Sequence, residues 1–99
     1  MTHKHGRRDE NHLEVCRQFQ QLGFSTLTLA DMGDNCPDLL ISRAGRTALI
    51  EIKSDGGKLT PGQARFAKDW RGRCYLVRGI DDILAITQAW FQDQPGDAR

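Results

Sequence analysis

Two carboxylates and an ammonium group occur at a spacing that a β-hairpin can bring together. Asp38 follows Pro37, and twelve residues separate it from the sequence Glu51-Ile52-Lys53. Side chains alternate along a strand, so Glu51 and Lys53 would project from one face and Ile52 from the other. Two carboxylates beside an ammonium group offer a hard, oxygen-lined site suited to Mg²⁺ or Mn²⁺. The same residues would also form an ordinary cross-strand salt bridge, and the hairpin alone does not separate the two interpretations.

The cysteines suggest a second candidate metal site. His12 and Cys16 are four residues apart, which on a helix would place two ligands on neighbouring turns, and Cys36 could complete a zinc site. The paired ligand spacing that is typical of zinc sites is absent, so we favour reduced thiols at these positions and at Cys74. No apolar stretch follows the basic N-terminus, and we therefore expect a cytoplasmic protein without a secretory signal.

The net charge of +1 conceals an uneven distribution of charge along the chain. Residues 43–78 carry nine Lys or Arg against three Asp or Glu, whereas the segments on either side are net acidic. The basic residues of this block are Arg43, Arg46, Lys53, Lys58, Arg65, Lys68, Arg71, Arg73 and Arg78. Such a block favours an anionic partner, and on charge alone a solvated surface is an equally good interpretation.

Length and composition predict one small domain. The chain has 99 residues, of which 38% are hydrophobic, enough for one core. No apolar run approaches the roughly 20 residues of a membrane span. We expect an ordered core over residues 8–92, with frayed termini at 1–7 and 93–99.

The first half of the chain predicts a helix, a strand and a hairpin. Val15 and Phe19 recur at helical spacing within a helix over residues 9–22, which Gly23 ends. Residues 25–30 alternate threonine with leucine, which is typical of a half-buried strand.

The hairpin carries the residues that could do chemistry. Its strands cover residues 38–43 and 47–53, and Ala44 and Gly45 form the tight reversal between them. The turn would carry Asp38 toward Glu51.

A strong helix start follows the hairpin. Thr60 is a good N-cap, Pro61 suits the first helical position, and Gln63 completes a capping box. This helix would end near Trp70. A strand over residues 73–78 and a helix over residues 81–92 follow.

The resulting order is α-β-β-β-α-β-α, an α/β fold with a mixed β-sheet flanked by helices, whose last strand is reached through a helical crossover. We expect four aromatic residues to pack in the core rather than to form stacking surfaces. They are Phe66, Trp70, Trp90 and Phe91.

Together these motifs resemble the VRR-NUC family of the PD-(D/E)xK nuclease superfamily, in its small phage or prophage form. The resemblance spans residues 7–90. Its matching segments are Arg8-Asp9-x-Asn11, Cys36-Pro37-Asp38, Glu51-Ile52-Lys53, Leu59-Thr60-Pro61-Gly62-Gln63 and the strand from Trp70 to Arg78. It implies a restriction-endonuclease-like fold and a metal-dependent endonuclease that hydrolyses phosphodiester bonds in DNA, with double-stranded or branched DNA, such as a Holliday junction, as the substrate.

The resemblance also implies roles for individual residues. Asp38 and Glu51 would bind Mg²⁺ or Mn²⁺, helped by the backbone carbonyl of Ile52. Lys53 would orient or activate the attacking water and offset negative charge in the transition state. Gln63 matches a glutamine that faces the site in this family.

The resemblance suggests one further acidic residue, and the position of the basic residues after the site suggests the DNA contacts. Glu14 matches the place of an acidic residue near the metal in Holliday-junction resolvases, although it also falls on the polar side of its helix. Residues that would contact DNA phosphates are Lys58, Arg65, Lys68, Arg71 and Arg73. Where the family usually has glycines before Pro-Asp, this chain has Asp34 and Asn35.

The resemblance implies a homodimer in a bacterial cell, since related small resolvases place two sites against two strands. Two other interpretations stay open: a catalytically silent DNA-binding module on the same fold, and a non-enzymatic phage interaction protein.

Overall fold

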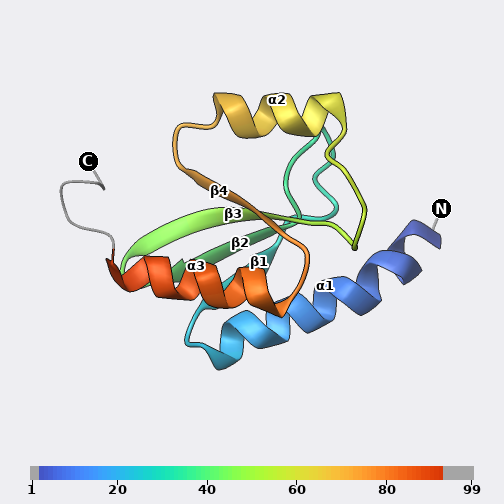
Figure 1. Ribbon diagram of the computed structural model, residues 1–99. Coiled ribbons are helices and arrows are strands. Elements are labelled where there is room, and N and C mark those ends of the chain that lie inside the picture. The colour runs from blue at the N-terminus through green and yellow to red at the C-terminus, as the bar shows by residue number, and fades with distance from the viewer. Residues whose placement is uncertain (1–2, 93–99) are drawn as a thin grey trace.

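A four-stranded mixed sheet lies at the centre of the fold, with the strand order β1-β2-β3-β4 (Figure 1). Strands β1 (Ser25–Thr28), β2 (Leu39–Arg43) and β3 (Arg46–Ile52) are antiparallel neighbours. Strand β4 (Arg73–Val77) pairs in parallel with β3. A parallel pair cannot be joined by a tight turn, and helix α2 (Pro61–Asp69) accordingly forms the crossover between the two strands.

The computed structural model describes residues 3–92, with side chains from residue 11 onward. Helices α1 (His3–Gln21) and α3 (Ile80–Gln92) lie against one face of the sheet, and α2 lies over the opposite face (Figure 1). The order α-β-β-β-α-β-α confirms the predicted fold class. Within residues 3–92, the helices lack the length and hydrophobicity that crossing a bilayer requires.

The hydrophobic core fills the space between the sheet and the α1–α3 layer. Phe19 from α1, Ile50 from β3 and Ile83 from α3 are fully buried there. Phe24 joins the layers through edge-to-face contacts, with ring centroids 5.2 Å from Phe19 and 5.0 Å from Trp90. The core therefore holds α1 and α3 firmly on one side and leaves the other face of the sheet for the candidate site.

Most element boundaries agree with the predictions, and α1 is the main difference. This helix begins at His3, whereas the sequence predicted a helix from residue 9 and a frayed segment over 1–7. Residues 3–7 are thus helical, and residues 1–2 and 93–99 of the predicted frayed termini lie outside the described residues. Strand β1 ends at Thr28, two residues before the predicted end.

The structure also shows which of the two alternating faces of β1 lies against α1. Its threonines face α1, where Thr28 Oγ1 lies 2.9 Å from His12 Nε2 and Thr26 Oγ1 accepts a bond from Gln20 Nε2 at 2.8 Å. Leu27 projects from the opposite face and is 57% exposed. Polar side chains on α1 therefore contact the threonine face of β1. The alternation of threonine and leucine in the sequence does not by itself reveal which face α1 covers.

The hairpin turn between β2 and β3 confirms the predicted reversal. Ala44 (φ 56°) and Gly45 (φ 78°) are both left-handed, as a two-residue type I′ turn requires. Arg43 and Arg46 are paired directly beside this turn. The turn fixes the register of β2 on β3, and this register determines where Asp38 meets Glu51.

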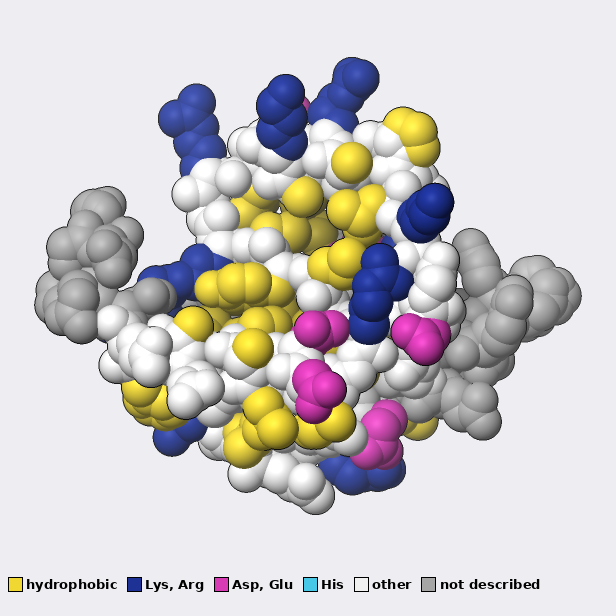
Figure 2. Space-filling model, in the orientation of Figure 1, with side chains coloured by type: hydrophobic (Ala, Val, Ile, Leu, Met, Phe, Trp, Pro, Cys, Tyr) yellow, Lys and Arg dark blue, Asp and Glu magenta, His cyan; other side chains and the backbone are white. Residues whose placement is uncertain are grey.

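Two predicted core aromatics prove to be surface residues, and a third is only partly buried. Helix α2 has no buried residue: Phe66 is half-buried and Trp70 is 46% exposed. Phe91 is also exposed, with the Arg43 guanidinium 4.4 Å from its ring centroid. Trp90 is buried as predicted, and its Nε1 donates a hydrogen bond to the Arg43 carbonyl. The prediction failed for α2 because the helix buries none of its residues against the sheet. Apolar side chains are therefore visible on the surface between the helix and the sheet (Figure 2).

Candidate active site

Asp38 is fixed at the point where β2 begins beside the end of β3. Its backbone N–H donates to the Ile50 carbonyl at 3.0 Å, and its own carbonyl accepts from the Leu29 N–H at 2.8 Å. The carboxylate is also held, because Oδ2 accepts the backbone N–H of Ile52 at 2.8 Å. These three bonds orient the Asp38 side chain toward the residues that follow on β3.

Glu51 is the one buried acidic side chain among residues 11–92, with 7% of its surface exposed. It projects from β3 toward α2, whereas its neighbour Ile52 packs against the core on the other face. The Asp38 carboxyl lies beside it, close enough for its charge and a side-chain hydrogen bond to raise the pKa of Glu51. The predicted hairpin thus brings Asp38 and Glu51 into direct contact.

The environment of Glu51 favours its protonated form. Burial, the negative charge of Asp38 and a hydrogen bond with Asp38 together raise the pKa of this carboxyl from 4.5 to about 8, while Lys53 opposes the shift. Without a cation, the Glu51 carboxyl is therefore mostly protonated at neutral pH. A divalent cation placed between them would take over the neutralising role of that proton.

Gln63 links helix α2 to the carboxylate pair. Its Oε1 accepts the Thr60 backbone N–H at 2.9 Å, and Thr60 Oγ1 accepts the Gln63 N–H at 3.1 Å, which completes the predicted capping box. Because Oε1 faces a donor, Nε2 points the other way and donates to Glu51 Oε2 at 3.2 Å. One side chain thus serves both as the helix cap and as a partner of Glu51.

Lys53 directly follows β3 and is held in register with β4. Its backbone N–H donates to the Val77 carbonyl at 3.0 Å. The ammonium group is close enough to Glu51 to lower the pKa of that carboxyl, against the effect of burial. Asp38, Glu51, Lys53 and Gln63 therefore form one cluster, as the sequence predicted.

The cluster fits a magnesium-type site in its donor chemistry. Mg²⁺ binds through one or two carboxylates and retains several water ligands, so Asp38, Glu51 and a nearby carbonyl such as that of Ile52 are sufficient. Among the described residues, no group of three or more His, Cys, Asp or Glu side chains is placed to hold a metal ion. The fit is therefore to a cation that keeps water ligands, rather than to one enclosed by side chains.

The zinc site that the sequence allowed is not assembled. His12 bonds Thr28, and the Cys16 thiol has a hydrogen-bond contact with Thr26 beneath α1. Cys36 lies instead near Asp38 and Glu51, whose charges add to burial in raising the pKa of its thiol. The three cysteines are free thiols, as predicted.

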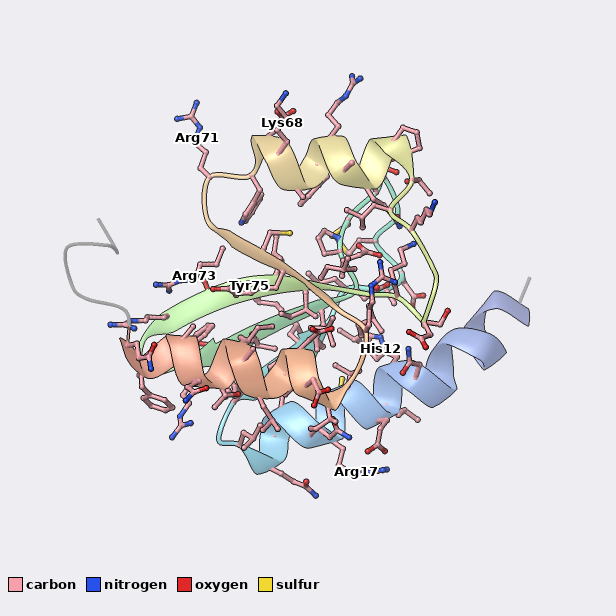
Figure 3. The ribbon with its side chains drawn as sticks, in the orientation of Figure 1. His12, Arg17, Lys68, Arg71, Arg73 and Tyr75 are labelled. Atoms are coloured by element: carbon pink, nitrogen blue, oxygen red, sulfur yellow. The ribbon has the colours of Figure 1, made fainter. Side chains whose placement is uncertain are left out.

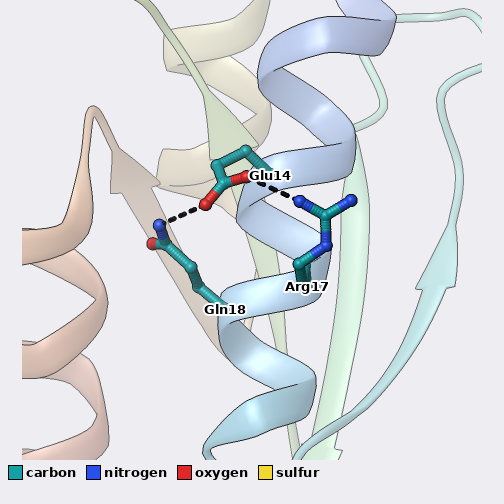
Figure 4. A network of polar contacts seen from close by, with 3 residues as sticks. All are labelled: Glu14, Arg17 and Gln18. Carbon is teal, nitrogen blue, oxygen red and sulfur yellow. Dashed lines mark hydrogen bonds and ion pairs between the residues drawn. The ribbon is translucent and has the colours of Figure 1, made fainter.

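The structure does not bring Glu14 to the carboxylate pair. Its Oε1 accepts from Arg17 Nη1 at 2.9 Å and its Oε2 accepts from Gln18 Nε2 at 2.7 Å, along the exposed side of α1 (Figure 4). Both oxygens are therefore engaged on the polar side of the helix. The prediction of Glu14 as a further metal ligand is not supported, because helix α1 presents its apolar side to the sheet.

The turn that precedes Asp38 has the backbone conformation that glycines would supply. Gly33 (φ 76°), Asp34 (φ 54°) and Asn35 (φ 64°) are left-handed in succession. Asn and Asp adopt this conformation more readily than other non-glycine residues. The chain then reaches Pro37, which is fully buried, and Asp38. Asp34 and Asn35 therefore form this turn without glycine and leave the Asp38 carboxylate in place.

Several residues of the basic block have structural partners. Arg43 Nη1 donates to the Leu22 carbonyl and Arg46 Nη1 to the Trp90 carbonyl, each at 2.6 Å. The Arg73 guanidinium lies 5.4 Å from the Trp90 ring centroid, so this predicted DNA contact packs against the α3 layer.

Arg78 is a residue near the site that sequence reasoning missed. Its Nη1 donates to the carbonyls of Ser54 and Gly57, and Asp82 Oδ2 accepts its backbone N–H at 2.7 Å. It thereby fixes the loop that directly follows Lys53. No local pattern could have revealed this role, since Arg78 and Ser54 are 24 residues apart.

The remaining predicted DNA contacts lie on and beside α2. Lys68 and Arg71 point away from the sheet (Figure 3), Lys58 is exposed before the helix, and Arg65 lies on the side of α2 near Asn35. Lys and Arg side chains gather along this helix in the space-filling view (Figure 2). The basic surface is therefore next to the carboxylate cluster rather than within it.

Chemically, the arrangement offers two oriented carboxylates, an ammonium group and an amide donor at the edge of a positively charged helix. Such a set can bind a hard divalent cation and a phosphate group together. The chain matches no protein-family model, no curated protein and no solved structure among those compared with it.

Proposed function

We propose that the protein is a Mg²⁺- or Mn²⁺-dependent endonuclease that hydrolyses phosphodiester bonds in DNA. The observation that carries this proposal is the placement of the oriented Asp38 carboxylate beside the buried Glu51 carboxyl, with Lys53 and Gln63 next to the pair. Two adjacent carboxylates repel each other and lower the stability of the fold unless a proton or a cation neutralises them. Residues with strongly shifted pKa values of this kind are concentrated at functional sites.

Each residue has a defined task in this mechanism. Asp38 and Glu51 would hold the cation with the Ile52 carbonyl, and the Ile52 N–H keeps Asp38 oriented for this purpose. When bound, the cation lowers the pKa of a coordinated water and offsets the charge on the phosphate. Lys53 would stabilise the negative charge that develops on the phosphate oxygens during attack.

Gln63 would act as a positioning residue. Its Nε2 donates to Glu51 while its Oε1 is fixed by the helix cap, so the orientation of Glu51 is tied to the position of α2. The basic residues along α2 would hold the DNA backbone beside the site. They are Lys58, Arg65, Lys68 and Arg71.

We further propose that the protein acts on branched or junction DNA as a homodimer. A domain of 99 residues offers little surface to contact a branched substrate alone, and two copies related by a two-fold axis would present one site to each of two strands. Light scattering coupled to size exclusion tests this point, and a monomer at micromolar concentration would contradict it.

The test of activity is incubation of the purified chain with branched, nicked and linear DNA in Mg²⁺, Mn²⁺ or EDTA. We expect cleavage only with a divalent cation, and losses of at least about 100-fold in Asp38→Ala and Lys53→Ala. Asp81→Ala removes an exposed carboxylate from α3, across the sheet from the site, and serves as the matched control. Cleavage in EDTA, or cleavage unaffected by Asp38→Ala, would refute the proposal. Tight DNA binding without cleavage would favour a silent binding module.

A further inference from the structure

A second concave site lies next to the carboxylate cluster, between α2 and the turn over residues 33–35. Its volume is about 470 Å³, within the range of small-molecule sites. The lining residues are Asp34, Asn35, Pro61, Gly62, Arg65, Phe66, Asp69 and Trp70. The mechanism proposed above uses this cleft only through the charge of Arg65.

One wall of the cleft is a pair of parallel aromatic rings. The centroids of Phe66 and Trp70 are 5.5 Å apart, and their planes differ by 13°. Trp70 is nevertheless 46% exposed, which leaves part of a large apolar surface in contact with water. Helix α2 ends before Trp70, whose extended backbone (φ −71°, ψ 128°) turns the indole back along the helix. Gly72 permits this fold-back, because a Cβ there would lie 2.9 Å from Trp70 Nε1.

The opposite wall of the cleft is polar. The left-handed turn places the Asn35 side chain over Gly62, where an added Cβ would lie 2.5 Å from Asn35 Oδ1. This close approach fixes the turn against the first turn of α2. An Asn amide offers both a donor and an acceptor, and Arg65 adds a cation beside the aromatic pair. Flat apolar surface, an amide and a cation are the chemical groups that bind a nucleobase with its phosphate.

The cleft and the carboxylate cluster have one lining residue in common, Phe66. The same ring lines a smaller cavity of about 150 Å³, whose other lining residues include Pro37, Glu51 and Gln63. A nucleotide seated on the aromatic pair would therefore lie next to the cavity that Glu51 lines, and this cavity is where the proposal places its neighbouring phosphate. Bases within a duplex are stacked on each other and cannot also stack on Trp70, so the cleft would accept only an unpaired base.

We propose that this cleft binds one unpaired nucleobase of the DNA substrate, next to the phosphate that the carboxylate cluster cleaves. The inference rests on the proposed nuclease function and gives it a physical basis for preferring branched DNA, where unpaired bases occur. Stacking on Trp70 would supply affinity without strong base preference, and Asn35 would contact the edge of the base.

The experiment uses the two tryptophans of the chain. Trp90 is 1% exposed, so quenching of the intrinsic fluorescence by added DNA reports on Trp70. The full chain in EDTA is titrated with an eight-residue oligothymidylate and with an abasic oligomer of the same length and charge. We expect quenching by oligothymidylate only, and about 5-fold to 100-fold tighter binding of it than of the abasic oligomer, measured by anisotropy of an end-labelled strand.

Variants separate stacking from charge. Trp70→Ala should reduce the affinity for oligothymidylate by about 5-fold to 100-fold and leave that for the abasic oligomer unchanged. Trp70→Phe retains a ring and should bind within a few-fold of the wild type. Phe91→Ala removes another exposed aromatic ring, from α3 on the other face of the sheet, and should have no effect.

The outcomes distinguish this inference from the nuclease proposal. Equal affinity for both oligomers, or unchanged binding in Trp70→Ala, would overturn the nucleobase site even if the protein cleaves DNA. Base-dependent quenching without cleavage in Mg²⁺ would support the nucleobase site and refute the nuclease. Loss of the preference for branched over linear duplex DNA in Trp70→Ala, with cleavage retained, would support both.

Discussion

Replacing Glu51 by glutamine should stabilise the cation-free protein above pH 8 and leave its stability nearly unchanged at pH 5. A glutamine amide reproduces the protonated carboxyl, since its NH₂ can donate to Asp38 and its oxygen can accept from Gln63 Nε2. The folded protein raises the pKa of Glu51 from 4.5 to about 8. A raised carboxyl pKa means that the folded state binds the proton more tightly than the unfolded state, so wild-type stability falls as pH rises between these two values.

The size of the effect follows from the shift in the pKa of Glu51. At about 1.4 kcal/mol for each tenfold change in proton affinity, the full shift corresponds to roughly 5 kcal/mol. Partial access of water to the site reduces this, and we expect a gain of about 2 to 3 kcal/mol for Glu51→Gln at pH 9. With a urea dependence of about 1–3 kcal/mol per molar, the unfolding midpoint should rise by about 1–2 M.

The assay is urea unfolding in EDTA at pH 5, 7 and 9, followed by the fluorescence of the buried Trp90. Glu14→Gln provides the control, because Glu14 is an exposed glutamate bonded only along its own helix. A difference between Glu51→Gln and the wild type that stays constant from pH 5 to pH 9 would refute the raised pKa of Glu51. Added Mg²⁺ at pH 8 should stabilise the wild type and not Glu51→Gln, because a cation that binds only the folded state adds to its stability.

Three further predictions test other parts of the structure. Ala44→Asn should raise the free energy of unfolding by about 1 kcal/mol in urea titrations, since asparagine accepts the left-handed turn better than alanine; a lower value would contradict the turn. Arg78→Gln should expose the 54–57 loop to proteolysis at unchanged helix content, and equal cleavage rates would show that Arg78 does not fix the loop. Alkylation of Cys36 by iodoacetamide at pH 8 should be slower than that of the unfolded chain, because burial and the Asp38–Glu51 pair raise the pKa of its thiol; an equal rate would contradict this.

The basic block shows where sequence reasoning reaches its limit. Composition alone cannot tell which of the nine Lys and Arg residues within 43–78 have structural partners and which are free to bind an anion. The structure divides them, because Arg43 and Arg46 donate to backbone carbonyls and Arg78 fixes a loop. Lys68 and Arg71 instead point outward from α2. A charge can be counted in a sequence, whereas its partner is set by elements that lie far apart in the chain.

Local interactions explain what the sequence determined by itself. The capping box of Thr60 and Gln63 and the reversal at Ala44 and Gly45 each depend on residues within a few positions of one another. Such signals fix the element order and place Asp38 opposite Glu51, because a two-residue turn leaves the hairpin one register.

Tertiary structure alone decided how these elements meet. The raised pKa of Glu51 depends on its burial beside Gln63 and on the nearby Asp38 carboxyl, and the exposure of Trp70 depends on how α2 packs on the sheet. The four-residue spacing of Phe66 and Trp70 predicts that both lie on one side of a helix, but it does not say where the helix ends or what covers that side. Which face is buried is a property of packing across the sheet, and no local spacing of residues encodes it.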